Sequence, residues 1–227
     1  MEYIIETNEI HKSFPIGGGD TLHVLKGINL KVPKGKLTIL KGRSGSGKTT
    51  LLNILSMLDE PSEGSFTIDG RDMSALSDKE KEKVRRYEIG FIFQSVALIP
   101  ILSAYENVDF GLRLAGYEGD RDKRIKEVLE TVGLGGRLNH MPAQLSGGEQ
   151  QRVAIARAVA HCPKIIFADE PTGALDTASG ITVMKLFKEI IEKEGITIVM
   201  TTHDPNLMQM GDRVYEMEDG EIRDVTA

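Results

Sequence analysis

Apolar and polar residues alternate along the first part of the chain, in the period-2 pattern of strands that bury one face. Residues 3–12 and 22–32 carry this pattern, and the glycine-rich segment Gly17–Asp20 predicts a turn between two antiparallel strands. Phe14 lies at the end of the first of these strands. It is either a half-buried strand aromatic or a flat surface on which an adenine ring could stack.

Further along, short runs that are apolar throughout indicate strands buried on both faces of a parallel sheet. These runs are Leu37–Lys41, Ile89–Phe93, Lys164–Ala168 and Ile196–Thr201. The region between about 95 and 161 differs, because it carries helical patterns at 103–116 and 120–133 and lacks strand signals. We therefore predict an α/β fold with a mixed, mainly parallel sheet, an antiparallel β subdomain and an inserted α-helical subdomain.

A glycine-rich segment joins the strand at Leu37–Lys41 to a helical pattern at 50–58, and Glu63 and Gly64 further along predict a turn. The segment reads Gly42, Arg43, Ser44, Gly45, Ser46, Gly47, Lys48 and Thr49, with Thr50 next, and it fits G-x-x-x-x-G-K-[ST]. The glycines allow successive backbone N–H groups to point at a phosphate chain, and the helix start adds a positive dipole end. Lys48 would reach the β- and γ-phosphates, and the Thr49 hydroxyl would bind Mg²⁺. The segment predicts a P-loop NTPase core.

Composition and charge narrow the class of protein further. The chain has 227 residues, of which 40% are hydrophobic, and a net charge of −6, which disfavours a nucleic-acid partner held by bulk charge. No apolar run approaches the roughly 18 residues of a membrane helix, and Met1–Glu6 lacks the pattern of a secretion signal. The single cysteine, Cys162, excludes an internal disulfide, and we expect it to be a small buried residue.

Polar residues follow three of the predicted parallel strands, where they would face a common ligand crevice. Asp169 would hold Mg²⁺, directly or through water, and Glu170 could polarise a water that attacks the γ-phosphate. Gln94 could bind a metal ion or position a water, although a surface glutamine is the simpler interpretation. His203 lies just past the strand at Ile196–Thr201, from where it could contact the γ-phosphate.

Two further segments each allow two interpretations. Ser146, followed by Gly147, Gly148 and Glu149, is either simply the cap of a helix or a second anion site formed by bare backbone N–H groups. The apolar stretch 96–102, interrupted by Pro100, is either core packing or part of a hydrophobic groove for a partner. The spacing of the residues leaves both questions open.

Taken in order along the chain, these motifs resemble those of the ATP-binding cassette (ABC) family, the nucleotide-binding subunits of ABC transporters. The resemblance rests on the loop Gly42–Thr49, on Gln94, Ser146–Glu149, Asp169–Glu170, Asp176 and His203, and it covers essentially the whole chain. It implies a single ABC ATPase domain over 1–227. Residues 1–94 and 162–227 would form a RecA-like core with its antiparallel β subdomain, and about 95–161 a helical subdomain with the signature motif.

The resemblance also implies an activity, cofactors and roles for single residues. It implies an ATPase that uses ATP and Mg²⁺, with Glu170 as catalytic base and His203 as a γ-phosphate contact. Two copies would lie head to tail, each ATP held between the phosphate loop of one copy and Ser146–Glu149 of the other. Phe14 would stack on adenine where tyrosine is more usual, Gln94 would join core and helical lobe, and Asp176 would lie in a loop that crosses the dimer interface.

Local motifs such as Asn53–Leu55, Ile89–Gln94 and Asp169–Asp176 are similar to those of the MacB/LolD-type group of cassettes. This resemblance implies an integral membrane permease as partner and a location at the cytoplasmic face of the cell membrane, with the subunit soluble when isolated. The alternatives are a soluble cassette of DNA repair or translation, for whose extra segments the chain has no room, and a cell-division-type cassette that regulates a cell-wall hydrolase.

Overall fold

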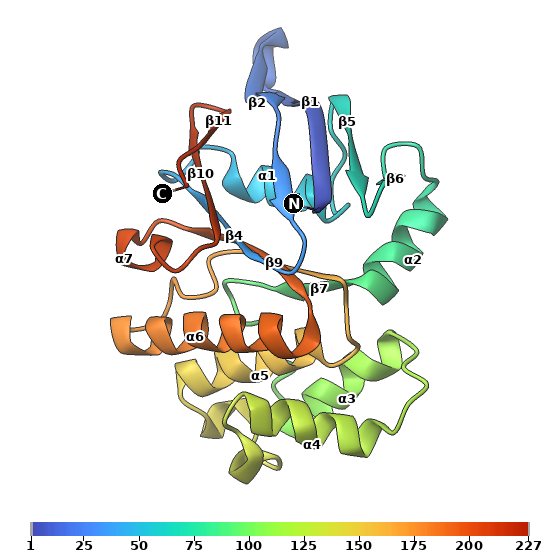
Figure 1. Cartoon of the computed structure of the whole chain (residues 1–227), viewed down its shortest axis with the longest axis vertical. Helices are drawn as coiled ribbons and strands as arrows, with labels where there is room; N and C mark the ends of the chain where they lie inside the picture. Colours follow the sequence, from blue (N-terminus) through green and yellow to red (C-terminus); the bar gives the residue numbers. More distant parts are fainter. Residues whose placement is uncertain (1, 227) are drawn as a thin grey trace.

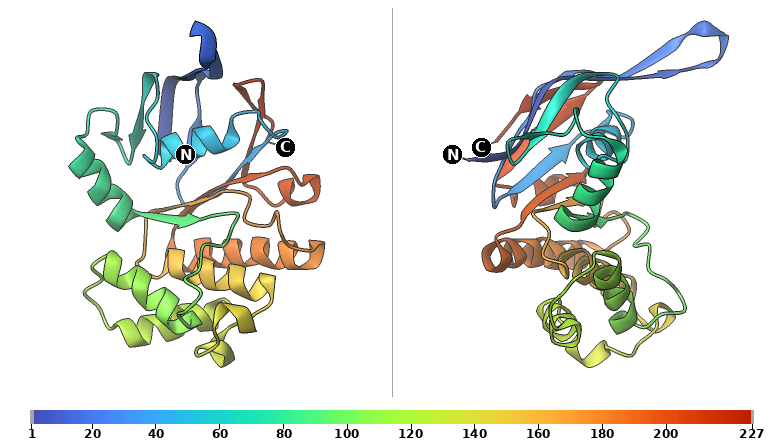
Figure 2. Two further views of the ribbon diagram at one scale, coloured as in Figure 1. Left: turned by 180° about the vertical axis from the view of Figure 1, so that it is seen from behind. Right: turned by 90° about the vertical axis from the view of Figure 1, so that its right-hand side faces the viewer.

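The computed structural model describes residues 2–226 and contains two sheets (Figure 1). The first is antiparallel, with strand order β2-β1-β5-β6 and with β3 also paired to β1. Its strands are β1 (Tyr3–Pro15), β2 (Thr21–Ile28), β3 (Lys31–Pro33), β5 (Glu63–Ile68) and β6 (Arg71–Asp72). The short helix η1 (Gly17–Gly19) turns the chain between β1 and β2. The β1–β2 hairpin projects well beyond the rest of the molecule (Figure 2, right).

The second sheet is the centre of the fold, with strand order β11-β10-β4-β9-β8-β7. Its strands are β4 (Leu37–Lys41), β7 (Ile89–Ile92), β8 (Ile165–Ala168), β9 (Thr197–Thr202), β10 (Arg213–Glu218) and β11 (Glu221–Asp224). All neighbouring pairs are parallel except β10 and β11, which form a hairpin. Together with the antiparallel sheet and the group of helices described next, it confirms the predicted fold class.

Helices cover both faces of the parallel sheet. Because successive residues of a strand point to opposite faces, each strand packs against helices on both sides. The α-helices are α1 (Lys48–Leu55), α2 (Asp78–Glu88), α3 (Ala104–Leu114), α4 (Arg121–Thr131), α5 (Gly147–Val159), α6 (Thr177–Glu194) and α7 (Pro205–Met208). Two short 3-10 helices, η2 (Gly135–Arg137) and η3 (Pro142–Gln144), lie between α4 and α5. Phe167 and Val199 face α1, in one buried cluster with Leu51. Their neighbours Ile166 and Ile198 point the other way, into a cluster with α5 and α6. As a result, α1 and α5 lie on opposite faces of this sheet (Figure 1).

Three local expectations are wrong. The helix after the phosphate loop ends at Leu55, with no extension to residue 58. Glu63 and Gly64, expected to form a turn, begin β5. Opposite them, the pairing of β1 with β5 is interrupted by a bulge between Asn8 and His11. A Cβ on Gly64 would lie 2.1 Å from the Glu9 carbonyl oxygen in this bulge, so only glycine fits here. Cys162 is exposed, because it lies in a turn after α5 with a φ of 56°.

Within residues 2–226 we find no helix that combines the length and the apolar character needed to cross a bilayer.

Candidate nucleotide site

The phosphate loop is tightly curled between β4 and α1. Gly47 is the residue before α1 and has a φ of 99°, which favours glycine. At Gly42, a Cβ would lie 2.4 Å from the Met217 carbonyl oxygen, so the chain passes too close to β10 for any side chain. Lys48 is buried, and its Nζ donates to the carbonyl oxygens of Gly42 and Arg43 at 2.8 and 3.0 Å. The lysine therefore holds the loop in its curled form.

Two buried polar side chains of this loop, Ser46 and Lys48, lack a hydrogen-bond partner and a carboxylate partner, respectively, among residues 2–226. The Ser46 hydroxyl is buried and has no hydrogen-bond partner among the described residues. The buried Lys48 ammonium donates to carbonyl oxygens, and no carboxylate lies within ion-pair distance of it in residues 2–226. Since unpaired buried polar groups are costly, a buried cation and hydroxyl beside a helix start fit an anionic group such as a phosphate chain.

A group of oxygen atoms lies next to the loop, where α1 begins and β8 and β9 end. The Thr49 hydroxyl is 3.1 Å from the Asp169 carboxylate. Thr201 donates from its hydroxyl to the same carboxylate at 2.6 Å and accepts from the Glu170 N–H at 2.8 Å. Carboxylate and hydroxyl oxygens are ligands that Mg²⁺ prefers, so Thr49 and Asp169 fit this cation. The importance of Thr201 was not apparent in the sequence, where its place at a strand end was the only signal.

Gln94, Glu170 and His203 form a row, because they follow the neighbouring strands β7, β8 and β9. The Glu170 carboxylate lies 3.3 Å from His203 Nδ1 and 3.5 Å from the Gln94 side-chain amide nitrogen. Glu170 itself has a φ of 42°, a left-handed conformation that is strained for a residue with a side chain. The structure thus brings together the three side chains that the sequence placed at strand ends. Gln94 contacts Glu170, whereas Thr49 contacts Asp169.

Ser146 and Glu149 form a complete capping box at the start of α5. The Ser146 N–H and hydroxyl donate to the Glu149 carboxylate at 2.8 and 2.9 Å, and these hydrogen bonds hold the pKa of Glu149 below its usual value. Asp176 caps α6 in a similar way, because it accepts from the Ser179 N–H at 3.0 Å. A Cβ on Gly148 would lie 3.5 Å from Ser179 Oγ, so the two helix starts are neighbours. Both helices pack on the face of the sheet opposite α1.

Phe14 lies on the projecting hairpin and is 37% exposed. Lys12 Nζ is 4.9 Å from the centroid of its ring and donates to the Glu60 carbonyl oxygen at 2.7 Å. A cation therefore covers one face of the ring and leaves stacking to the other. The hairpin rises beside the phosphate loop, since a Cβ on Gly47 would lie 2.8 Å from Leu25 of β2.

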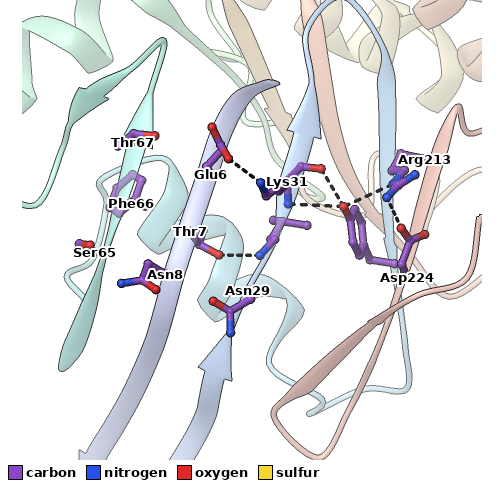
Figure 3. A pocket seen from close by; sticks show the side chains of 12 residues that line it. Glu6, Thr7, Asn8, Asn29, Lys31, Ser65, Phe66, Thr67, Arg213 and Asp224 are labelled. Atoms are coloured by element: carbon purple, nitrogen blue, oxygen red, sulfur yellow. Dashed lines mark hydrogen bonds and ion pairs between the residues drawn. The ribbon is translucent and has the colours of Figure 1, made fainter. Parts of the chain in front are cut away.

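A separate cavity of about 680 Å³ lies between the antiparallel sheet and the β10–β11 hairpin (Figure 3). Its two cations are paired with carboxylates, Lys31 with Glu6 at 3.0 Å and Arg213 with Asp224. The Tyr215 hydroxyl donates to the Lys31 carbonyl oxygen at 2.7 Å and so links the two sheets. None of the predicted site residues lines this cavity, and its paired charges offer little to a phosphate.

The parallel sheet, its phosphate loop and a separate capped Ser-Gly-Gly helix start on one chain define an ATP-binding cassette. Comparison with known proteins gives the same result: the family model described as ABC transporter matches residues 25–173, and the chain belongs to this family. It is an ABC ATPase.

Individual relatives place the chain among cassettes of the MacB type, as the sequence motifs indicated. It is 49% identical to the uncharacterized ABC transporter ATP-binding protein MJ1508 of Methanocaldococcus jannaschii, over 98% of this chain and 99% of that protein. It is 45% identical to the macrolide export ATP-binding/permease protein MacB of Syntrophobacter fumaroxidans, over 96% of this chain but 31% of that protein. A dimeric structure of the cassette MJ0796 in a post-hydrolysis state, bound to ADP and Pi, matches with a TM-score of 0.88 and 43% identity, over 98% of each chain.

Proposed function

We propose that two copies of this chain enclose ATP head to tail and so drive a membrane permease. The observation that carries this proposal is the separation of the two helix starts. The loop Gly42–Thr49 leads into α1 on one face of the parallel sheet, and Ser146–Glu149 begins α5 on the other. One chain cannot close both on the same nucleotide, whereas two chains related by a two-fold axis can do so twice. The dimeric relative MJ0796 supports this arrangement.

Gly147 gives independent support for a ligand at the start of α5. A Cβ at this position would meet nothing within 4 Å, and the residue lies in ordinary helical backbone. Among the described residues of one chain, nothing near this position requires glycine. A close approach by a group from outside the chain explains the choice. The partner's γ-phosphate is the group that we propose.

The site residues divide the chemistry between them. Gly42–Thr50 would wrap the phosphates, and Thr49 and Asp169 would hold Mg²⁺, which neutralises phosphate charge when bound, with Gln94 as a further ligand or water contact. Glu170 would accept a proton from the attacking water, with His203 beside it at the γ-phosphate. Phe14 would stack on adenine. Asp176 would approach the partner copy from the start of α6.

An apolar groove supports the proposal of a permease partner. It has a volume of about 300 Å³ and lies between β7, α3 and α5, lined among others by Phe91, Phe93, Phe110 and Leu114. Ile101, in the adjoining stretch 96–102, is 80% exposed, while Leu98 packs against the core. Of the two interpretations of this stretch, core packing describes Leu98, and the exposure of Ile101 leaves it free for the partner contact that we propose. We propose that a cytoplasmic helix of the permease covers Ile101 and the groove, which would hold the subunit at the cytoplasmic face of the membrane.

A photo-crosslinking amino acid at Ile101 is expected to capture an integral membrane protein in living cells. The same probe at Leu58, an equally apolar residue that is 50% exposed but lies after α1, serves as the matched control and should capture none. In the same strain, Ile101→Asp should abolish transport-linked phenotypes while the purified subunit keeps its basal ATPase activity. Equal capture from both positions would refute the groove as the permease contact.

The names of the relatives favour this reading over a soluble cassette of DNA repair or translation. MacB of Syntrophobacter fumaroxidans is named as one ATP-binding/permease protein, and this chain matches its cassette-sized part. A cell-division-type cassette would share the site and differ in its partner, so the captured membrane protein also distinguishes these two proposals.

A further inference from the structure

Arg157, near the end of α5, has an unusual environment for a charged side chain. It lines the apolar groove and is half-buried, and partial burial lowers the pKa of its guanidinium. Its hydrogen bonds go to two backbone carbonyl oxygens, those of Ala97 at 2.7 Å and Val96 at 3.4 Å. No carboxylate of residues 2–226 pairs with it. A half-buried guanidinium without a carboxylate partner has lost part of its hydration, and these two carbonyl oxygens replace the lost hydrogen bonds.

The backbone that it holds is strained. Val96 and Ala97 have φ values of 61° and 49°, so two consecutive residues with side chains adopt the left-handed conformation. This conformation is disfavoured for L-residues and most of all for a β-branched one such as valine. Without an external restraint the segment would relax to negative φ. The two carbonyl oxygens bound to Arg157 provide such a restraint.

The position of the Arg157 side chain is itself fixed by a neighbouring helix. A Cβ on Gly111 of α3 would lie 2.9 Å from Arg157 Cγ and 3.4 Å from the Arg157 carbonyl oxygen. Gly111 has ordinary helical backbone, so its close contact with the arginine, and not a special φ, explains the glycine. The helical lobe is thus shaped to keep this side chain in place.

The strained pair lies two residues after Gln94, whose side-chain amide nitrogen is 3.5 Å from the Glu170 carboxylate. We propose that Arg157 is a positioning residue for ATP hydrolysis, which holds Val96 and Ala97 in their left-handed conformation and thereby sets Gln94 against Glu170. This inference rests on the proposed roles of Gln94 and Glu170. It connects the helix that begins with Ser146 to the row of strand-end side chains through a contact inside one chain.

The test separates positioning from folding by using glycine, which adopts positive φ without strain. In Arg157→Met the strained pair loses its restraint, and kcat of the purified chain is expected to fall by roughly tenfold or more, since small misplacements have large catalytic effects. KM for ATP should change by less than about twofold, because the phosphate loop is untouched. Adding Val96→Gly and Ala97→Gly to Arg157→Met should restore most of kcat, because glycine adopts the left-handed conformation without the hydrogen bonds from Arg157.

Two further variants complete the design. Gly111→Ala pushes against the Arg157 stem without changing a charge, and it should lower kcat in the same direction even if Arg157→Met folds poorly. Arg124→Met is the matched control, because Arg124 also donates to backbone carbonyl oxygens, those of Val159 and Ala160, but does not touch the Gln94 segment. Its folded fraction should keep the parent kcat.

The outcomes distinguish this inference from the proposed function beneath it. If Gln94→Ala lowers kcat but Arg157→Met and Gly111→Ala do not, Arg157 does not position Gln94, and the proposed role of Gln94 stands. If Gln94→Ala has no effect, the proposed site chemistry fails first. A loss of activity in Arg157→Met that the two glycines do not restore would show an arginine that only stabilises the lobe.

Discussion

Glu170→Gln is expected to lower kcat for ATP hydrolysis by at least about a hundredfold, because removal of a positioned general base typically costs this much. Glutamine keeps the size of the side chain and can still face His203, which lies 3.3 Å from the carboxylate. It loses the ability to accept a proton from water, and it removes a negative charge next to the γ-phosphate. ATP binding should therefore persist or strengthen while turnover stops.

The same variant should accumulate as a dimer. Without hydrolysis the two copies stay closed on ATP, so sedimentation of Glu170→Gln with ATP and Mg²⁺ should give a dimer, and with ADP a monomer. Glu189→Gln, on the exposed side of α6 where Glu189 pairs with Lys193, is the control and should behave as the parent. Hydrolysis by Glu170→Gln at the parent rate would show that another group acts as the base.

Gly147→Asp is expected to abolish ATPase activity without weakening the fold. An acidic side chain in the first turn of a helix interacts favourably with the helix dipole, and a Cβ at Gly147 meets nothing within 4 Å. The melting temperature of the nucleotide-free chain should therefore stay the same or rise. In the proposed dimer, however, the new carboxylate would face the γ-phosphate of the partner's ATP and repel it.

A matched substitution makes this result specific. Gly136, in the turn η2, also has open space around its Cβ position, so Gly136→Asp adds the same charge on the same lobe. Gly136→Asp should keep the parent ATPase activity. ATP binding by monomeric Gly147→Asp, measured by equilibrium dialysis, should equal that of the parent, since its own phosphate loop is unchanged. Full activity of Gly147→Asp would mean that α5 does not contact nucleotide.

The sequence predicted which side chains lie close together where each of them directly follows a strand or belongs to one continuous segment; their roles stay predictions. The phosphate loop carries its strand and its helix on either side, and Glu170 and His203 directly follow apolar strands. Parallel strands place such residues at one edge of the sheet, so proximity follows from order alone. The capping box of Ser146 and Glu149 could also be predicted from the sequence, because its two residues are three positions apart.

The sequence could not reveal features that depend on contacts between distant residues. The bond from Arg157 to Ala97 spans 60 positions, and neither residue belongs to a motif. Gly64 and Gly111 gave no hint of the backbone and side chain that approach them. Cys162 was misjudged because residue type alone suggested burial, whereas a turn with a φ of 56° carries it to the surface.

The curled phosphate loop has a consequence for how the chain responds to its product. Because Lys48 already holds the loop closed through the carbonyl oxygens of Gly42 and Arg43, little ordering is needed when a diphosphate group enters. ADP offers the loop the same diphosphate as ATP, so we expect the loop backbone to bind both, while Lys48 and His203 can distinguish them only through the γ-phosphate. ADP should then compete for each subunit, and the cellular ratio of ATP to ADP would govern how many cassettes are ready to pair.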